Sequence, residues 1–349
     1  MKEMKKISTI EKYAIPSESN YFKLDANENL VLEKDFLTKI SLESLKKIDL
    51  RKYPIALYER LYKKLSHYLK ISEKSLVLGS GSDQIIDLLL TLIGNGRRLT
   101  SIYPTFSYFK TRCQLHGIAF SEIMLSSIDN SLDMKEFVAD AKKSHAIYLC
   151  SPNNPTGNQF DKSDILHILD TLKNNLVIVD EAYVEFSKYS LTKYVNEYPN
   201  LVILRTFSKA LGLAGARVGY MIANEKLAEL FRYRIQLPYA VNSLSLAIAM
   251  SLLSKPKKIQ ESISLIKHER ERLYQNLSKI KNIYVYKSDA NFLFIKCNTK
   301  YGRIVKTLEN SKIIVKGLGN IKSYGNCVRI TVGTRKMNNK ILSAIKDIH

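Results

Sequence analysis

From Leu57 to about residue 242 the chain alternates short apolar runs with longer amphipathic stretches, and this alternation constrains the fold more than any other feature. Such a rhythm is typical of a parallel sheet whose strands are connected by helices. Several runs are continuous in Val, Ile and Leu, which indicates strands buried on both faces. The predicted strands are Leu76–Leu78, Leu99–Tyr103, Ala146–Cys150, Leu176–Asp180, Leu201–Arg205 and Val218–Ile222, and the predicted helices are Leu57–Lys70, Ser82–Ile93, Ser163–Lys173 and Glu225–Ile235.

The rhythm changes after Asn242, where two helical stretches precede several short strands and a closing helix, the pattern of a smaller α+β domain. Before Leu57 the chain is polar, with one short helix expected at Phe36–Ile48. We therefore expect an N-terminal arm (1–20), a small domain (21–50 with 243–349) and a large α/β domain (51–242). The expected small-domain elements are helices at Ser243–Leu253 and Lys257–Ile280 and strands at Ile283–Tyr286, Asn291–Lys296, Ile313–Val315 and Cys327–Thr331.

Composition excludes several classes of protein. The 349 residues are 45% hydrophobic and 25% charged, so the chain is neither disordered nor a small disulfide scaffold. The four cysteines are far apart, without a CxxC pair or clustered histidines, which predicts no metal site and a reducing, cytoplasmic location. Polar residues interrupt the longest apolar stretches, so we expect no membrane span.

The charge balance is strongly basic, with 54 Lys and Arg against 33 Asp and Glu, a net charge of +21. Such an excess favours anionic partners. The lysines occur in ones and twos along the chain, and no RNA-binding signature or zinc-finger spacing is present. We therefore expect a lysine-rich surface and no nucleic-acid partner.

A turn with the sequence Gly79-Ser80-Gly81-Ser82-Asp83 follows the first predicted strand and leads into an apolar helix. Glycine permits the tight turn, Ser82 is expected to cap the helix, and the free amides at the helix start suit a phosphate group. Many strand-to-helix turns carry Gly and Ser, so this motif alone is weak evidence.

Three further polar motifs follow predicted strands. The loop SPNNPTG, at Ser151–Gly157, is rigid enough to hold the amide of Asn154 in one direction. Asp180 ends an apolar strand, where a carboxylate loses hydration and is expected to need a cationic partner. Lys209 follows Thr206-Phe207-Ser208, and a lysine in such a cleft forms a Schiff base if its pKa is lowered. Taken singly, Asp180 could be a loop cap and Lys209 a surface lysine.

Together these motifs suit a pyridine aldehyde phosphate, which needs a lysine, an acid near the ring nitrogen, donors to the ring oxygen and a basic phosphate cup. The chain resembles the fold-type-I pyridoxal-phosphate aminotransferases, and more closely the histidinol-phosphate aminotransferase family. The residues that carry this resemblance are LDANEN (Leu24–Asn29), RKYP (Arg51–Pro54), SPNNPTG, VDEAYVEF (Val179–Phe186), RTFSKALGLAGARVGY (Arg205–Tyr220) and RITVGTR (Arg329–Arg335).

The resemblance implies an α/β fold with a mostly parallel central sheet between helices, a smaller α+β domain, and a homodimer with shared active sites. It implies ping-pong transfer of an amino group between L-histidinol phosphate and 2-oxoglutarate in histidine biosynthesis, with pyridoxal 5'-phosphate as cofactor. Lys209, Asp180 and Tyr183 would be catalytic. The implied cofactor-binding residues are Gly81, Ser82, Asp83, Phe106, Asn154, Asp180, Tyr183, Thr206, Ser208, Lys209, Arg217 and Tyr53, and the implied substrate-binding residues are Tyr13, Asn27, Lys316 and Arg329.

Within these sets, Phe106 would stack on the cofactor ring and Tyr53 would reach the partner subunit's cofactor phosphate. Arg329 would pair with an anionic substrate group, and Tyr13 would close over the substrate phosphate from the other subunit. One departure concerns Lys316, in IIVKGLG, where the family usually carries arginine. Lysine keeps the charge but loses two-pronged donation, which leaves the amino donor open.

Three alternatives therefore remain at this point. Two are enzymes of the same fold, a phosphothreonine decarboxylase and an aromatic-amino-acid aminotransferase. The third is a regulator that binds anions or nucleic acid, which only the charge of +21 favours.

Overall fold

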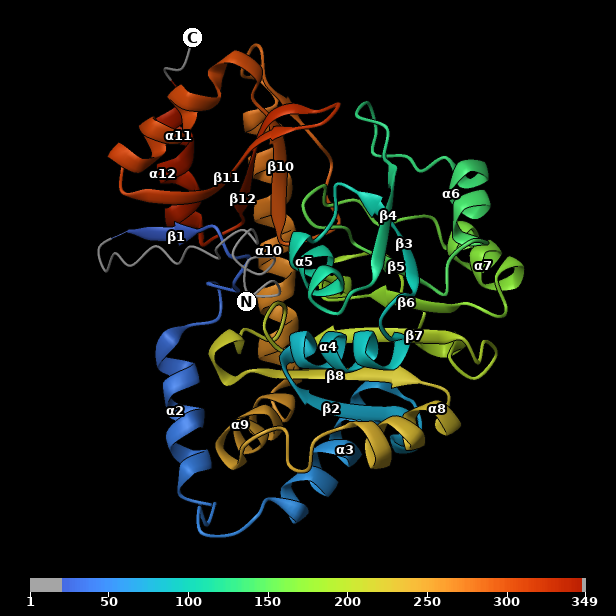
Figure 1. Cartoon of the computed structure of the whole chain (residues 1–349). Coiled ribbons are helices and arrows are strands. Elements are labelled where there is room, and N and C mark those ends of the chain that lie inside the picture. Colours follow the sequence, from blue (N-terminus) through green and yellow to red (C-terminus); the bar gives the residue numbers. More distant parts are fainter. Residues whose placement is uncertain (1–20, 347–349) are drawn as a thin grey trace, which may run out of the picture.

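The structure is a computed structural model of the chain, and it describes residues 21–346. Figure 1 shows a seven-stranded sheet with helices around it and a five-stranded sheet beside it. In the larger sheet the strand order is β2-β8-β7-β6-β5-β3-β4, and only β8 runs antiparallel to its neighbours. Its strands are β2 (Leu76–Ser80), β3 (Arg98–Tyr103), β4 (Ala119–Met124), β5 (Ala146–Cys150), β6 (Leu176–Asp180), β7 (Leu201–Thr206) and β8 (Val218–Ala223).

The mostly parallel α/β sheet that the sequence predicts is confirmed, and all six predicted strands form. The prediction missed β4, which lies at the edge of the sheet and pairs only with β3. An edge strand is less covered than a central one, so its sequence AFSEIM needs no continuous apolar run.

Helices connect the strands of the larger sheet, most of them near their predicted positions. The prediction missed α5 and α6, and the predicted helix after β8 divides into α8 and a π-helical turn at Phe231–Ile235. The connecting helices are α4 (Gly81–Ile93), α5 (Ser107–Leu115), α6 (Met134–Ala141) and α7 (Lys162–Thr171), while α3 (Ile55–Leu69) precedes β2 and α8 (Glu225–Leu230) follows β8.

The smaller sheet joins the two ends of the described chain. Its order is β1-β11-β12-β10-β9, and β1 pairs in parallel with β11, placing Phe22 opposite Ile313. β11 extends beyond the predicted strand because a register shift between Gly317 and Gly319 lets the pairing continue past two glycines. The strands are β1 (Phe22–Leu24), β9 (Tyr284–Val285), β10 (Phe292–Lys296), β11 (Ile313–Ile321) and β12 (Gly325–Thr331), and the helices beside them are α10 (Pro256–Leu277), α11 (Tyr301–Asn310) and α12 (Arg335–Ile345).

Two further helices, α2 (Lys34–Leu45) and α9 (Ser243–Leu253), pack against each other, and the hydroxyls of Ser44 and Ser251 lie 2.7 Å apart. The domain bounds expected from the sequence stay a prediction.

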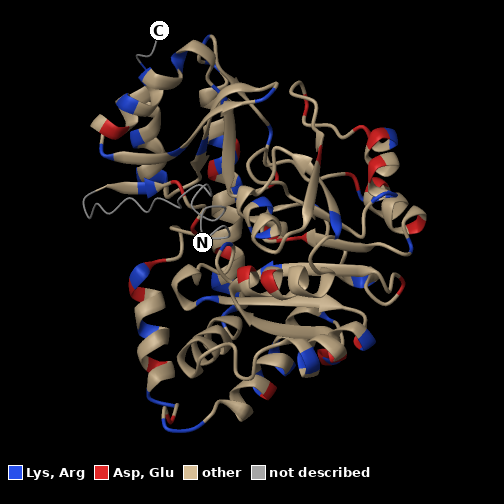
Figure 2. Cartoon of the chain, viewed as in Figure 1, with Lys and Arg blue, Asp and Glu red and all other residues tan. Residues whose placement is uncertain are grey.

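The carboxyl ends of β5, β6 and β7 meet at one edge of the larger sheet. The parallel register places Cys150 opposite Asp180, and Asp180 opposite Leu204. The polar segments that follow these three strands therefore start side by side, which is where open α/β sheets bind ligands. Lys and Arg positions are instead spread over both sheets and most helices, without a single stripe (Figure 2).

Candidate active site

Asp180 is the last residue of β6, and its side chain is buried. Tyr148 Oη donates to Asp180 Oδ2 at 2.8 Å, and the Ala182 N–H donates to Oδ1 at 3.0 Å. None of the ion pairs found between residues 21 and 346 includes Asp180, although the charge of Lys209 lowers its pKa, so a cationic partner for this carboxyl stays a prediction. Neutral donors satisfy the carboxyl, and burial raises the pKa of Asp180 to about 6 although both hydrogen bonds oppose the shift.

Lys209 follows β7 and is half-buried. Its Nζ donates to the carbonyl oxygen of Ala26 at 2.7 Å and lies 5.8 Å from the centre of the Tyr183 ring. Burial and, next, the positive charge of Arg329 lower the pKa of Lys209 to about 8. About a tenth of this amine is therefore unprotonated and nucleophilic at pH 7, far more than for an ordinary lysine.

Tyr183 lies where segments from both sheets meet. Asn27 Nδ2 donates to Tyr183 Oη at 3.0 Å, and the Tyr183 ring meets the edge of Phe292 with centroids 5.2 Å apart. The backbone N–H of Asn27 donates to Thr331 Oγ1 at 3.0 Å, and Asn291 Nδ2 donates to the Asn27 carbonyl at 2.9 Å. The Tyr183 hydroxyl is thus held by a buried polar cluster from β12 and the segment before β10.

Arg329, on β12, connects the smaller sheet to the SPNNPTG loop. Its Nη1 donates to Asn154 Oδ1 at 2.6 Å, and its Nη2 donates to the carbonyl oxygen of Asp25. Arg329 and Asn154 are both buried. Lys316 lies opposite Arg329 in the β11–β12 pair, but its side chain is exposed.

The turn before α4 brings together several of the residues that the sequence predicts for a phosphate site. Gly81 has a φ of +75°, and a Cβ there would lie 2.6 Å from Arg217 Nη2. Arg217 donates through Nη2 to Asp83 Oδ2 at 2.8 Å, and its Nη1 lies 3.5 Å from Ser208 Oγ. Backbone amides, a hydroxyl and a guanidinium therefore gather around the start of α4, a suitable arrangement for a phosphate group.

The start of α4 differs from the prediction, and a further hydrogen bond holds the segment before Lys209. The helix begins at Gly81, with Ser80 as its N-cap residue, so Ser82 is not the cap and lies inside the first turn. The cap therefore lies two residues earlier than expected, and Gly81, the first helical residue, has a positive φ. Thr206 Oγ1 accepts from the Ser208 N–H at 3.1 Å, which holds the segment that leads to Lys209.

Two more of the predicted site residues, Phe106 and Tyr53, lie in the described part of the chain. Phe106 is half-buried and directly precedes α5. Tyr53 is 77% exposed, and its ring stacks on Tyr239 with centroids 4.8 Å apart. Within the described residues, no hydrogen bond or ring contact connects Tyr53 to the other predicted site residues. Tyr13 lies outside the described residues.

Sequence reasoning missed Tyr148, Thr331 and Asn291, which hold Asp180 and Asn27. Tyr148 and Thr331 lie in apolar strands, where an aromatic or β-branched residue is most simply explained as part of the core. The signal in the sequence that could have identified these residues is the polar group in each side chain, because a buried hydroxyl or amide needs a hydrogen-bond partner.

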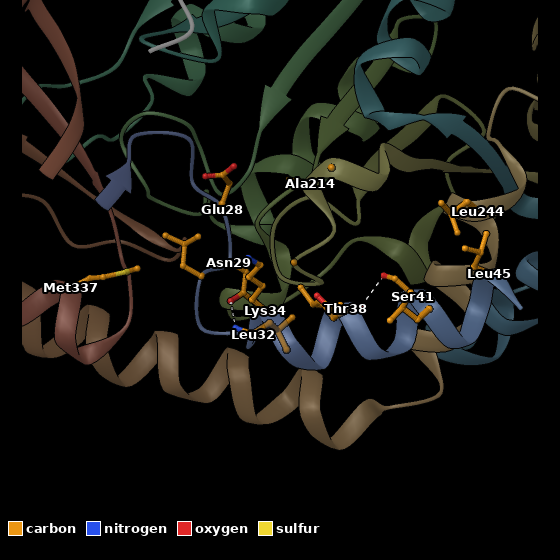
Figure 3. Close-up of a pocket in the computed structure, with 15 residues that line it drawn as sticks. Glu28, Asn29, Leu32, Lys34, Thr38, Ser41, Leu45, Ala214, Leu244 and Met337 are labelled. Atoms are coloured by element: carbon orange, nitrogen blue, oxygen red, sulfur yellow. Dashed lines mark hydrogen bonds between the residues drawn. The ribbon is translucent and has the colours of Figure 1, made fainter. Parts of the chain in front are cut away.

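A cavity of about 700 Å³ beside α2 does not coincide with the predicted site. Figure 3 shows α2 along one wall and Ala214 on the opposite side, with Glu28 and Asn29 between β1 and α2. None of the predicted site residues lines this cavity. We therefore place the candidate active site at the cluster around Asp180 and Lys209 on the basis of side-chain chemistry, and not at this cavity.

The side chains of this site match the groups that pyridoxal phosphate needs. Lys209 supplies an amine with a lowered pKa, and Asp180 supplies a buried carboxylate that can accept from a ring nitrogen. Tyr183 and Asn154 supply a hydroxyl and an amide, and the Gly81 turn with Arg217 supplies a cradle that a side chain at residue 81 would fill. No cluster of three or more His, Cys, Asp or Glu suited to a metal ion occurs in residues 21–346. None of the helices in that part of the chain is both long and apolar enough to cross a membrane.

Comparison with known proteins gives a consistent result. Residues 19–345 match the family described as aminotransferase class I and II. A histidinol-phosphate aminotransferase of Pyrococcus furiosus is 37% identical over 95% of this chain and 93% of its own length. Among solved structures, the histidinol-phosphate aminotransferase of Clostridium acetobutylicum superposes with a TM-score of 0.85 at 26% identity, covering 94% of this chain and 98% of that one. The Sinorhizobium meliloti enzyme, solved in complex with pyridoxal-5'-phosphate, gives a TM-score of 0.87 at 21% identity, with coverage of 99% and 97%.

Proposed function

The chain belongs to the class I and II aminotransferases, and from this premise we propose that it transfers the amino group between L-histidinol phosphate and 2-oxoglutarate, with pyridoxal 5'-phosphate as its cofactor. The products are imidazole acetol phosphate and glutamate, a step of histidine biosynthesis. The observation that carries the reaction type is the meeting of a Lys209 amine whose pKa is lowered with a buried Asp180 carboxylate at one edge of the sheet.

Each chemical task of the proposed reaction has a residue in this chain to perform it. The bound cofactor supplies an electron-withdrawing ring that stabilises negative charge at the substrate Cα. Asp180 holds the proton on the ring nitrogen, and Tyr183 and Asn154 donate to the ring oxygen. Lys209 Nζ removes the proton from the substrate Cα and returns one in the second half of the ping-pong cycle. Gly81, Ser82, Thr206, Ser208 and Arg217 would hold the phosphate, with the Asp83 carboxylate orienting Arg217, and Phe106 would stack on the ring.

The choice of amino donor rests on the relatives and on two cations. The 37% identical relative is a histidinol-phosphate aminotransferase, which favours this donor over phosphothreonine or an aromatic amino acid. Arg329 and Lys316 face each other across β11 and β12, where they can bind the phosphate or carboxylate of the substrates. Asn27, bonded to Tyr183, borders the same space, and Tyr13 completes the proposed substrate set.

We further propose a homodimer. Ten of the fifteen large exposed hydrophobic side chains of the described residues lie in two stretches, 42–55 and 230–244. The two stretches meet where Tyr53 stacks on Tyr239. An apolar surface of this kind is typical of a subunit interface, and a second copy of the chain is the occupant that would also bring Tyr53 to the partner's cofactor phosphate.

The cytoplasm is the location that we propose. Cys113, Cys150, Cys297 and Cys327 are all free and buried, which suits a reducing compartment. Nucleic acid is not among the proposed partners, because the basic residues are spread over both sheets rather than gathered in one stripe (Figure 2).

The visible absorption spectrum of the holoenzyme tests the proposal. Addition of L-histidinol phosphate without a keto acid should convert the long-wavelength band of the lysine-bound cofactor into the band of pyridoxamine phosphate, and 2-oxoglutarate should restore it. A spectrum that changes with phosphothreonine or phenylalanine but not with L-histidinol phosphate would move the donor to one of those alternatives. Failure of the purified protein to take up pyridoxal phosphate would remove the enzyme assignment.

A further inference from the structure

Tyr148 lies in the middle of β5 and is completely buried. Its ring stacks on Phe109 of α5, with centroids 3.6 Å apart and planes inclined by 16°. The hydroxyl reaches across to the next strand, where it donates to Asp180 Oδ2 at 2.8 Å. The ring is therefore fixed by packing and the hydroxyl by a hydrogen bond, as a positioning group requires.

The direction of this hydrogen bond follows from the two groups. Burial and the nearby carboxylate of Asp180 raise the pKa of Tyr148 well above its usual range, so the phenol keeps its proton. An ionised carboxylate only accepts hydrogen bonds. Tyr148 is thus the donor throughout the physiological pH range.

Asp180 needs such donors because its surroundings oppose ionisation. Burial is the largest influence and raises its pKa, and the charge of Asp83 acts in the same sense. Three groups lower it, namely the Tyr148 hydroxyl, the Ala182 amide and the charge of Lys209. Cys150, opposite Asp180 in the sheet, and Tyr183 are the other titratable groups nearby, and burial keeps both neutral.

The three groups that favour ionisation of Asp180 differ in whether they stay beside it during the reaction. Lys209 is committed to the substrate during the proposed reaction, and the Ala182 amide belongs to the backbone. Tyr148 is therefore the side chain whose support for the Asp180 carboxylate persists throughout the reaction.

We propose that Tyr148 is a positioning residue for the transamination proposed above: its hydroxyl keeps Asp180 ionised and aimed at the ring nitrogen of the cofactor. The inference rests on the proposed function for its consequence, but the link between Tyr148 and Asp180 belongs to the chain itself. Without the hydroxyl, Asp180 would be neutral over part of the working pH range and could not hold a proton on the ring nitrogen.

Tyr148→Phe tests this inference, since it removes the hydroxyl and keeps the ring that packs on Phe109. In the apoprotein, the carboxyl ¹³C resonance of Asp180, assigned with Asp180→Asn, should titrate about 1 to 2 pH units higher than in the wild type, the worth of one hydrogen bond to a charged group. In the holoenzyme with ¹⁵N-labelled pyridoxal phosphate, the ring nitrogen should lose its proton-bound chemical shift, and kcat should fall with little change in KM.

Tyr324→Phe is the matched control, because Tyr324 is also fully buried and its hydroxyl donates to Ser126 O at 3.0 Å and to Asn130 Oδ1 at 2.9 Å. This variant should leave the Asp180 titration unchanged. An Asp180 titration in Tyr148→Phe that coincides with that of the wild type would overturn the inference, whether or not the cofactor binds. A shifted titration in a protein that binds no pyridoxal phosphate would instead support the link and remove the proposed function.

Discussion

Lys316 and Arg329 lie directly opposite each other in the antiparallel pair of β11 and β12. Opposite residues in such a pair point to the same face of the sheet, so two positive charges are neighbours there. Arg329 is buried and anchored on Asn154, whereas Lys316 is exposed. Two like charges placed opposite each other destabilise a sheet, and an anionic group bound between them would offset this repulsion.

The first prediction concerns Lys316. Lys316→Ala should raise the KM for L-histidinol phosphate by about 5- to 10-fold, the value of one exposed charge-assisted contact, and leave kcat nearly unchanged. Unphosphorylated L-histidinol, assayed in parallel, should show no such difference between the two proteins. Lys316→Arg, which restores two-pronged donation, should give a KM equal to or lower than that of the wild type. Equal losses with both donors would show that Lys316 does not contact the phosphate.

A second prediction follows from the lowered pKa of Lys209, about 8 compared with the ordinary 10.5. Only the neutral amine attacks the cofactor, so the rate at which apoprotein acquires the long-wavelength band should rise with pH and level off above about 8. Stopped-flow mixing with pyridoxal phosphate between pH 6 and 10 measures this midpoint.

Arg329→Met is the companion variant for this experiment, because the charge of Arg329 is the second cause of the lowered Lys209 pKa. Its loss should move the midpoint upward. Lys209→Ala should show no band at any pH and no steady-state turnover. A wild-type midpoint near 10.5 would contradict the environment that the structure gives Lys209.

Asp180 gives a third prediction, on stability. Its pKa in the folded apoprotein is raised from 3.8 to about 6, so the folded state binds the Asp180 proton more tightly than the unfolded state does. This preference stabilises the folded state fully below pH 3.8, and the stabilisation is lost as the pH rises through 6. Relative to Asp180→Asn, wild-type apoprotein should lose about 2 kcal/mol of unfolding free energy between pH 4.5 and 7.5.

Urea denaturation of both apoproteins at the two pH values measures this difference. Asp161→Asn, at an exposed site, is the control for the substitution itself. Parallel stability curves for wild type and Asp180→Asn would mean that the carboxyl is not destabilised by burial. Pyridoxal phosphate should stabilise the wild type more than the variant, because only the wild type offers a carboxylate to the ring nitrogen.

These residues also show how far the sequence could predict the molecule. The strands on either side of Asp180 were predictable because strands buried on both faces leave continuous apolar runs, as in β5, β6 and β7. The edge strand β4 leaves no such run, and β1 finds its partner β11 almost three hundred residues away. Long-range pairing of that kind has no local signal in a single sequence.

The candidate site likewise contains residues that the sequence could predict and contacts that it could not. Motifs that follow strands, such as Asp180 and Lys209, could be located from the sequence because parallel strands bring their carboxyl ends together. The sequence could not show that the Tyr148 hydroxyl donates to Asp180, because that contact depends on the register of β5 and β6. The role of Tyr53 stays a prediction, since it concerns a second copy of the chain.

The fourth prediction tests that role with hybrid dimers. Tyr53 is exposed and stacks on Tyr239, whereas the described contacts of Lys209 are with Ala26 and Tyr183. If Tyr53 serves the partner's site, a Tyr53→Ala subunit paired with a Lys209→Ala subunit has one complete site, made of Lys209 from the first and Tyr53 from the second. An equal mixture of the two weakly active variants, dissociated and reassociated at limiting pyridoxal phosphate, should therefore regain about a quarter of wild-type activity, since random pairing makes half of the dimers hybrid. Tyr324→Phe mixed with Lys209→Ala controls for losses on reassociation. Activity that only averages that of the two variants would place Tyr53 outside the shared site, because a residue acting within its own subunit cannot be supplied by the other.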